Sequence, residues 1–562
     1  MTEAMDSRLE SSAGAMPDSP NSVLAEYGTP VLTNMSRELS DADARYRYND
    51  ALPIHKLPPE LLTTILYHAR CKAQDIRFSH VCKRWRELVL GMPEFWAAMV
   101  GLVCQSLWPR REHRPGYDGP DDYEVLERCL ALSEPRMIRA TFWVFREQEQ
   151  RTTARYVERL ECVTVKFSDV TSIRVFANAL EQGMPNLTTL NYHATYRHPR
   201  DLPPLDPWLP VNLNEQCLPR LRRLHVYTRF GLPPSASFRA SLLELSLTGD
   251  PAPGPMADID YFVQALSACT SLESLELVEA IPAPWVLGDT PRKRRDAGRA
   301  LRLPQLRALT VAQCHVRAAL GALWLTDAAP STHIRVRFPS GISGAYKTLF
   351  EEDTILRSHT IPSLVHVYIG TTRRKGRIRA LGYTSDGIER FALGAWGYDD
   401  ECLFRHLLPF ANSPVTTLAI NLPALPVLSC CELEWTGYCP LPRQLRRFEL
   451  LQRTPLAIKR RFLRWLLDTA PQSRTRDMTL CWTVDVERGW EKESHEDLLA
   501  LEAVLAEFPE HRLGRLELYG FTLKGLNTTH ASLLPTNPGR CAEVAEPHMA
   551  SLSELVGEVI VM

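Results

Sequence analysis

Short stretches with three apolar residues, in the form L-x-x-L-x-L with other apolar residues allowed, recur along most of this 562-residue chain. They are "VERLEC" (157–162), "LTTLNY" (187–192), "LRRLHV" (221–226), "LLELSL" (242–247), "LESLEL" (272–277), "LRALTV" (306–311), "LVHVYI" (364–369), "IERFAL" (388–393), "VTTLAI" (415–420), "LRRFEL" (445–450), "LGRLEL" (513–518) and, more weakly, "TRDMTL" (475–480). Roughly one window in ten would fit by chance, so the spacing carries more weight. The middle positions follow one another at 30, 34, 21, 30 and 34 residues from 160 to 309, and at 27, 30, 30 and 38 residues from 391 to 516.

The segments between these stretches have helical periodicity, as in "ADIDYFVQALSACT" (257–270), and a proline often precedes the strand, as in "LPQLRAL" (303–309). One strand and one helix per step predict an α/β solenoid of stacked units over residues 155–540. The pattern resembles the leucine-rich repeat family, but steps of 34 and 38 residues exceed its usual length of about 20–29. The Asn or Cys expected after the third leucine position is mostly missing, and "THIRVRF" (332–338) is only a doubtful unit. We expect an irregular solenoid, with a large α/β domain without a repeat as the alternative.

Residues 49–100 form a separate helical segment crowded with large apolar side chains. "KLPPELLTTILYHAR" (56–70) predicts a first helix with prolines in its first turn, where a missing N–H costs nothing. A second short helix is expected around Ile76–Cys82 and a third around Trp85, ending near Gly91 and Pro93. A segment this short cannot bury all these side chains by itself. The composition therefore indicates an apolar partner.

The order "LPPELLTTIL", "IRFSHVCKRWRELV" and "MPEFW" resembles an F-box, a motif that docks on the Skp-type adaptor of a cullin ubiquitin ligase. The resemblance covers under a tenth of the chain. The residues at positions similar to the family's core and adaptor-contact sites are Leu57, Pro58, Leu61, Leu62, Ile65, Val81, Cys82, Trp85 and Trp96. The sequence alone does not separate the core residues from the contact residues. An F-box followed by a leucine-rich-repeat-like tail also resembles the F-box-like proteins of mushroom-forming fungi.

The predicted organisation has five parts. Residues 1–48 form a disordered, mildly acidic arm. The F-box occupies 49–100, a linker with a helix and a first strand occupies 101–154, the solenoid occupies 155–540, and a cap or tail occupies 541–562. A charged loop rich in Gly and Pro is expected at 108–122.

Composition excludes several classes of protein. Lys plus Arg (65) and Asp plus Glu (66) give a net charge of −1, which provides no general attraction to nucleic acid or anionic membranes. No secretion signal or apolar run long enough to span a membrane is present, so we expect a cytoplasmic or nuclear protein with reduced cysteines. We find no phosphate-binding motif, metal-ligand spacing or nucleophile motif. We therefore expect no enzyme activity, cofactor or metal.

Two basic runs need separate interpretation, "PRKRRDAGRALR" (291–302) with six bases and "TTRRKGRIRA" (371–380) with five. Each could be a localisation signal or a phosphate-contacting loop, but solvated loops are the more ordinary interpretation. One of them could be a β-hairpin with "RKGR" (374–377) as its turn. Aromatic residues are not interleaved with these bases, which disfavours nucleic-acid binding.

The sequence therefore predicts a substrate receptor that binds the Skp-type adaptor, and through it a cullin, while the solenoid binds a protein client. In a strand, alternate side chains point to opposite faces. The outward residues expected to contact the client are Arg223 and His225, Ser274 and Glu276, and Arg447 and Glu449. A scaffold without client degradation, a nucleic-acid-associated protein and an enzyme on an unrecognised α/β fold are the alternatives.

Overall fold

The structure is a computed structural model that describes the chain from Leu52 to Val561 with gaps, so the predicted arm 1–48 lies outside the described residues. The longest gaps are 113–119, 195–212, 250–257, 339–355, 396–409, 422–443, 484–490 and 524–541, and shorter ones occur elsewhere. The chain divides into two compact units, Met1–Phe95 and Trp96–Met562. The described residues form a mixed α/β protein with thirteen α-helices and a sheet of sixteen strands.

The first unit consists of short helices. It contains η1 (Pro53–Lys56), α2 (Pro59–Ala69), η2 (Ala73–His80), α3 (Lys83–Leu90) and the first turn of α4 (Pro93–Glu112). The predicted first and third helices are present, whereas the second is a 3-10 helix that begins at Ala73. Cys82 caps α3, because its Sγ accepts a hydrogen bond from the Trp85 N–H at 3.5 Å, and Gly91 ends the helix as expected.

A small core holds these helices together. Leu62, Leu66 and Val89 are almost fully buried. The Phe78 ring lies 6.2 Å from the Trp85 ring and 6.4 Å from the Phe95 ring, measured between centroids. Burial of each large apolar side chain contributes about 1.5–3 kcal/mol. The core therefore uses one side of α2 and leaves the other side to solvent.

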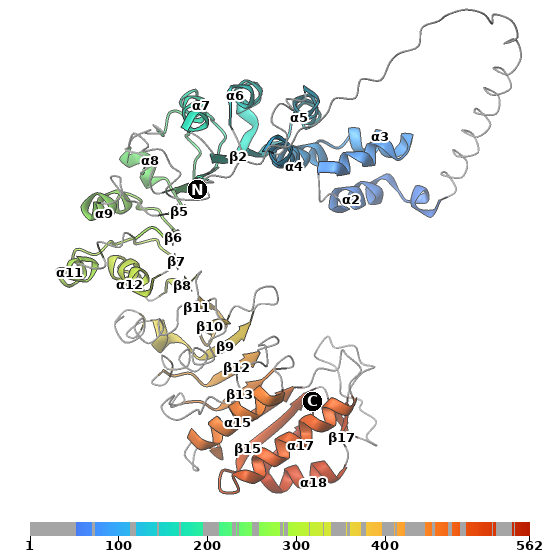
Figure 1. The fold of residues 1–562 in the computed structure, drawn as a ribbon, viewed down its shortest axis with the longest axis vertical. Coiled ribbons are helices and arrows are strands. Elements are labelled where there is room, and N and C mark those ends of the chain that lie inside the picture. Colours follow the sequence, from blue (N-terminus) through green and yellow to red (C-terminus); the bar gives the residue numbers. More distant parts are fainter. Residues whose placement is uncertain are drawn as a thin grey trace, which may run out of the picture. The chain divides into compact units, whose positions relative to one another are not determined.

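The second unit contains the sixteen-stranded sheet (Figure 1). In sheet order the strands are β1 (Ile138–Phe142), β2 (Leu160–Phe167), β3 (Thr189–Ala194), β4 (Arg223–Tyr227), β5 (Glu244–Thr248), β6 (Ser274–Val278), β7 (Ala308–Ala312), β8 (His333–Phe338), β11 (Glu389–Ala395), β10 (Ile378–Tyr383), β9 (His366–Thr371), β12 (Thr417–Asn421), β13 (Arg447–Leu450), β14 (Thr479–Thr483), β15 (Leu513–Tyr519) and β18 (Val556–Val561). All neighbours are parallel except those of β10. Strands β16 (Phe521–Leu523) and β17 (Ala542–Val544) form a separate pair.

A recurring turn precedes six of the described strands. The N–H of the first apolar residue of the pattern donates to the carbonyl three residues earlier, as Leu187 does to Met184 (3.1 Å) and Leu306 does to Leu303 (3.1 Å). Proline often follows the accepting residue, where its fixed φ suits a turn. Thr188 follows Leu187 directly, and its carbonyl accepts hydrogen bonds from two successive amides of the next strand, those of Arg222 (2.9 Å) and Arg223 (3.0 Å).

Helices cover one face of the sheet. They are α5 (Pro120–Leu132), α6 (Glu147–Ala154), α7 (Val170–Glu181), α8 (Ala236–Ala240), α9 (Ile259–Ser267), α11 (Thr290–Asp296), α12 (Val316–Leu325), α15 (Leu456–Thr469), α17 (Glu491–Glu507) and α18 (Glu546–Leu555). Along β2–β8, the helices α7, α8, α9 and α12 all lie on the same side of the strands (Figure 1). The apolar strand residues point to this side, as shown by Phe448 of β13, whose ring lies 6.4 Å from that of Phe462 in α15.

The burial predicted for the repeated pattern is confirmed. The apolar positions of "LESLEL", "LRALTV" and "LRRFEL" are at most 4% exposed, whereas Glu276, Thr310 and Glu449 between them are partly exposed. The doubtful "THIRVRF" stretch is the regular parallel strand β8. The weaker match "TRDMTL" (475–480) also follows the burial pattern, because Thr475 occupies the place of the expected apolar residue and is fully buried.

The expectation of one parallel strand per step is wrong between His366 and Ala395. Strands β9, β10 and β11 form an antiparallel meander, in which β11 pairs with β8 and β9 pairs with β12. The β10–β11 turn contains Asp386 and Gly387, and Gly387 has a φ of +78°, the left-handed conformation that such hairpin loops require. The suggested hairpin at 371–380 is present as β9–β10, although its turn lies outside the described residues.

The sheet extends beyond the predicted solenoid at both ends, because β1 pairs with β2 and β18 pairs with β15. The predicted loop 108–122 is shorter than expected, since α4 continues to Glu112 and α5 begins at Pro120. At the far end, Gly514 permits close strand packing: a Cβ there would lie 2.0 Å from the Arg476 carbonyl oxygen.

A buried ion pair joins α15 to α17, and it generates a test of this packing. Lys459 Nζ lies 2.8 Å from Asp497 Oδ2 and 2.8 Å from the Thr483 carbonyl oxygen at the end of β14. Lys459 is 2% exposed. We expect Lys459→Met to lower the free energy of unfolding by about 3–5 kcal/mol, because Asp497 is left buried without its cation. Chemical denaturation measures this change.

The same two helices provide the matched control. Arg464 and Glu507 form an ion pair between α15 and α17 whose side chains are 48% and 44% exposed. Arg464→Met should cost less than about 1 kcal/mol, because exposed pairs contribute little. Equal costs for the two variants would contradict the assigned burial of Lys459.

Candidate interaction surfaces

Exposed apolar side chains are concentrated in the first unit. Of the ten large apolar side chains that are at least 36% exposed among the described residues, five belong to this short unit: Leu61, Ile65, Tyr67, Val81 and Leu90. Leu61 is 53% exposed, Ile65 44% and Val81 53%. These three residues form what we call the apolar patch. Concentrated exposure of this kind marks an interaction site in a soluble protein.

Helical spacing explains why Leu61 and Ile65 lie on one side of α2. Leu61 and Ile65 are four residues apart and share a face, while Leu62 and Leu66, each one position later, face the core. The Arg84 guanidinium of α3 donates to the Leu57 carbonyl at 2.8 Å and holds the start of α3 near the start of α2. Val81, just before α3, and Leu61, near the start of α2, therefore come from neighbouring ends of the two helices.

The structure sorts the nine residues assigned to adaptor binding. Exposed members are Pro58, Leu61, Ile65 and Val81; half-buried members are Leu57, Cys82 and Trp85; buried members are Leu62 and Trp96. Leu62 and Trp96 are 0% and 3% exposed, so they are core residues rather than contact residues. Cys82 acts as a helix cap. The exposed members can contact a partner without rearrangement, whereas Leu62 and Trp96 cannot.

The face of the sheet away from the helices is polar, and we call it the strand face. In parallel register, side chains from successive strands form continuous rows along it. One row runs through Asn191, His225, Ser246, Glu276, Thr310 and Arg335, and the other runs through Thr189, Arg223, Glu244, Ser274, Ala308 and His333. The sequence pattern placed Arg223, His225, Ser274 and Glu276 on this face, and the register brings them together.

Charges in the first half of the strand face neutralise one another across strands. Arg223 pairs with Glu244 of the next strand, with 3.1 Å between Nε and Oε1. The Glu276 carboxylate accepts from the Ser246 hydroxyl at 2.9 Å and lies 3.9 Å from Arg337. Such pairs fix side-chain directions on the sheet. This surface therefore presents ordered charges with little net charge.

Two clusters on the strand face were missing from the predicted set. Glu389 of β11 lies 3.1 Å from His333 and 3.4 Å from Arg335. "THIRVRF" contained the signal for both residues of β8, but it was interpreted only as a doubtful unit. Glu389 could not be placed, because the meander that brings β11 beside β8 was not predicted.

The second missing cluster surrounds Glu517 of β15. Arg447 Nη2 lies 2.9 Å from its carboxylate, and Arg515 Nε also lies 2.9 Å from it, although Glu517 is only 5% exposed. Arg447 also pairs with Glu449 at 2.6 Å. "LGRLEL" repeats the spacing of "LRRFEL", so Arg515 and Glu517 could have been predicted alongside Arg447 and Glu449.

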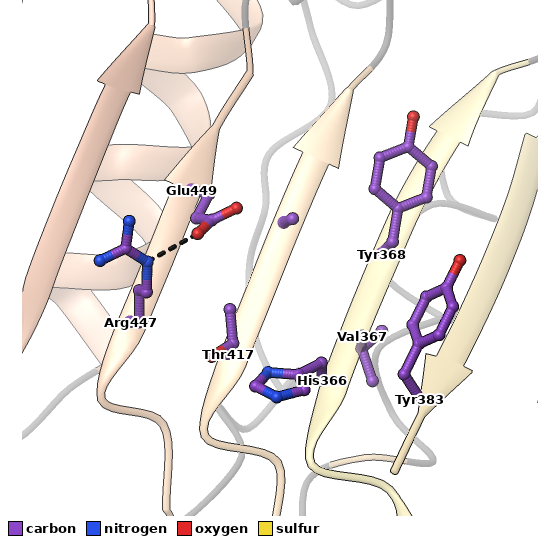
Figure 2. A pocket seen from close by; sticks show the side chains of 8 residues that line it. His366, Val367, Tyr368, Tyr383, Thr417, Arg447 and Glu449 are labelled. Carbon is purple, nitrogen blue, oxygen red and sulfur yellow. Dashed lines mark hydrogen bonds and ion pairs between the residues drawn. The ribbon is translucent and has the colours of Figure 1, made fainter. Parts of the chain in front are cut away.

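A shallow, open hollow of about 340 Å³ lies on the strand face between these clusters (Figure 2). We call it the anchor hollow. It is lined by His366, Val367 and Tyr368 of β9, Tyr383 of β10, Thr417 and Ala419 of β12, and Arg447 and Glu449 of β13. Figure 2 shows both tyrosine rings standing up from the strands, with Arg447 and Glu449 paired at one side. The anchor hollow therefore combines aromatic surfaces with a neutralised charge pair.

The first half of the first basic run is helical rather than a loop. Thr290–Asp296 forms α11, in which Arg294 pairs with Asp260 and the Arg292 guanidinium lies 5.9 Å from the centre of the Trp324 ring. These two arginines are used within the protein. For the second run, the side chains of 371–379 lie outside the described residues.

Several thiols are buried and protonated. Burial raises the pKa of Cys104, Cys129 and Cys269 to about 12, so these thiols are not nucleophiles at neutral pH. Within the part of the chain that the structure describes, no group of three or more His, Cys, Asp or Glu side chains could hold a metal ion. Also among these residues, no single helix is long and apolar enough to cross a membrane; one bent pair, Lys83–Leu90 with Pro93–Gln105, has the length and composition.

Comparison with known proteins gives no relative. No model of a known protein family matches the chain, and no curated protein matches it in sequence. The functional argument therefore rests on the residues themselves and on their geometry.

The strand face makes a testable contribution to pH dependence. Burial lowers the pKa of His225, and the neighbouring Glu276 and Glu244 only partly oppose this effect. The unfolded chain therefore binds a proton near pH 6.5 that the folded chain binds only at lower pH. The free energy of unfolding should fall as pH drops from about 6.5 to the lowered pKa of His225.

We expect His225→Gln to reduce this loss of stability, measured as the thermal midpoint between pH 7 and pH 5. His511 is partly exposed and provides the matched control as His511→Gln. An unchanged pH profile in His225→Gln would contradict the role of its burial.

Proposed function

We propose that this protein is a non-catalytic substrate receptor of a cullin-based ubiquitin ligase, in which residues 49–100 act as an F-box that docks on a Skp-type adaptor. The observation that carries the proposal is the apolar patch. Leu61, Ile65 and Val81 are strongly exposed on a small unit whose core is already formed by Leu62 and Leu66. Leaving such side chains in water forgoes about 1.5–3 kcal/mol each, which an apolar partner groove would recover.

The sequence order supports the adaptor as that partner. "LPPELLTTIL", "VCKRW" and "MPEFW" follow one another with F-box spacing. The exposed Pro58, Leu61 and Ile65 all come from the first of these stretches and the exposed Val81 comes from the second. Of the residues at F-box positions, Leu62 and Trp96 are buried. The exposure therefore separates the F-box positions that a partner could reach from those that are buried.

The client surface in this proposal is the strand face of a leucine-rich-repeat-like solenoid. The support is the parallel register from β1 to β8 and from β9 and β12 to β18, with apolar residues toward the helices and polar residues on the other face. A face assembled from many strands can present a specific set of charges without a catalytic residue. Its mixed, internally paired charge fits a protein rather than nucleic acid.

The mechanism we propose is proximity. The receptor would hold a client near a ubiquitin-conjugating enzyme recruited elsewhere in the complex, which raises the client's effective concentration. This role needs no cofactor and no nucleophile from the chain, and it would operate in the cytoplasm or nucleus, where such ligases act.

The docking proposal is tested with Leu61→Asp and Ile65→Asp combined in the full chain. Leu62 is left unchanged, because a charge at that buried site would disrupt the core. Two charges placed in an apolar contact should cost about 3 kcal/mol or more, which weakens adaptor binding by about a hundredfold. Binding to purified Skp-type adaptor, measured by calorimetry, checks this.

The matched control is Leu499→Asp on α17, since Leu499 is also an exposed leucine on a helix, at 45%. It should bind the adaptor like the wild-type chain. Full adaptor binding by the Leu61/Ile65 variant would refute the docking model.

The client surface is tested with Arg223→Glu and Glu276→Arg combined. Arg447 is unsuitable for reversal, because a carboxylate there would face the buried Glu517. We expect the variant to lose proteins that the full chain retains, with adaptor binding unchanged, because the two sites lie in separate units. Mass spectrometry of the retained proteins measures this.

Reversal of an exposed pair on a helix, Glu147→Arg with Arg151→Glu, is the control. If the strand-face variant and this control retain the same proteins, the strand face is not the client surface. If retained proteins are not destabilised in cells, the alternative role as a scaffold without client degradation is favoured.

A further inference from the structure

We propose that the anchor hollow takes one uncharged aromatic side chain of a protein client that lies along the strand face. The proposal rests on the proposed function only in calling the bound protein a client. The anchor hollow would bind such a segment whether or not ubiquitin transfer follows. Its occupant is argued from the aromatic lining, from the charge balance on both sides of the hollow and from its size.

The lining provides ring surfaces where the rest of the strand face provides charges. Tyr368 and Tyr383 come from adjacent antiparallel strands, and both rings stand at the hollow (Figure 2). Tyrosine contributes a large, rigid contact area at low entropic cost, and aromatic pairs stack favourably beyond their buried area. Between β9 and β13, strand β12 contributes Thr417 and the small Ala419, whose register partners are Tyr368 and Glu449.

The neighbouring clusters exclude a charged occupant. On one side, Glu389 lies 3.1 Å from His333 and 3.4 Å from Arg335. On the other side, Arg447 and Arg515 balance two carboxylates: Arg447 lies 2.6 Å from Glu449 and 2.9 Å from Glu517, and Arg515 lies 2.9 Å from Glu517. A phosphate or a charged side chain would lose water without meeting a net opposite charge. An uncharged side chain has no such cost.

The size also fits one side chain. A volume of about 340 Å³ is near the lower limit of small-molecule pockets, which enclose most of their ligand and span roughly 300–1,000 Å³. The anchor hollow is open rather than enclosed, so it would cover one ring of a longer segment. The polar rows on both sides would then contact the rest of that segment.

The test uses the purified full-length chain as bait for a displayed library of random short peptides. We expect the selected peptides to share an aromatic residue. They should bind Tyr368→Ala and Tyr383→Ala at least tenfold more weakly than the wild-type chain, as expected for an interface anchor. Tyr368→Phe should stay within a few-fold of wild type, because the ring remains.

Tyr261→Ala is the matched control, since Tyr261 is a half-buried tyrosine on helix α9 rather than on the strand face. It should bind the selected peptides normally. Thermal unfolding of each variant shows whether it is folded.

Failures of the two proposals are distinguishable. Selected peptides that lack an aromatic residue, or that bind the two alanine variants normally, overturn the anchor hollow. A Tyr368→Phe variant as weak as Tyr368→Ala overturns the aromatic contact, because the hydroxyl would then be responsible. If the wild-type chain does not bind the adaptor but its peptide binding depends on the tyrosines, the proposed ligase role is overturned and the anchor hollow is supported.

Discussion

Hydrogen bonds at the start of many parallel strands fix the register on which the rest of the second unit depends. The carbonyls of Thr188, Arg222, Leu243, Glu273 and Thr416 each accept from two successive amides of the neighbouring strand. At the start of β3, for example, the acceptor Thr188 comes one residue after Leu187, whose N–H closes the turn. The position of such an acceptor sets which side chains of the next strand face the helices. A slip of one residue would exchange the two faces and bury every charge of the strand face.

That register gives the two faces of the sheet different chemistry. On the helix side, alternate apolar residues pack against α7–α17, and the buried Lys459–Asp497 pair joins two of those helices. On the strand face, arginines and glutamates stand on adjacent strands and pair with one another. A charge on that face therefore acts as part of a cluster, so substitutions of neighbouring residues such as Arg447 and Glu517 will not be additive.

The irregular part of the sheet creates the anchor hollow. The row on the strand face that contains Arg335 continues from β8 through Ala392, Leu381, Tyr368 and Ala419 before it reaches Glu449 of β13. These four residues carry no charge and separate Arg335 from Glu449. The antiparallel meander brings Tyr383 beside His366. A regular parallel repeat would have no reversed strand in this place. The antiparallel meander that interrupts the parallel strands therefore also supplies the two tyrosines of the anchor hollow.

Local sequence determined much of this protein. Gly91 marked the end of α3, and the L-x-x-L-x-L pattern placed Arg223, Glu276 and Glu449 on one face, because side-chain direction follows from backbone periodicity alone. Tertiary structure decided which strands are neighbours, and therefore that Glu389 meets His333, that Glu517 is buried between Arg447 and Arg515, and that Trp96 is core. These contacts join residues far apart in the sequence, and no local pattern encodes them.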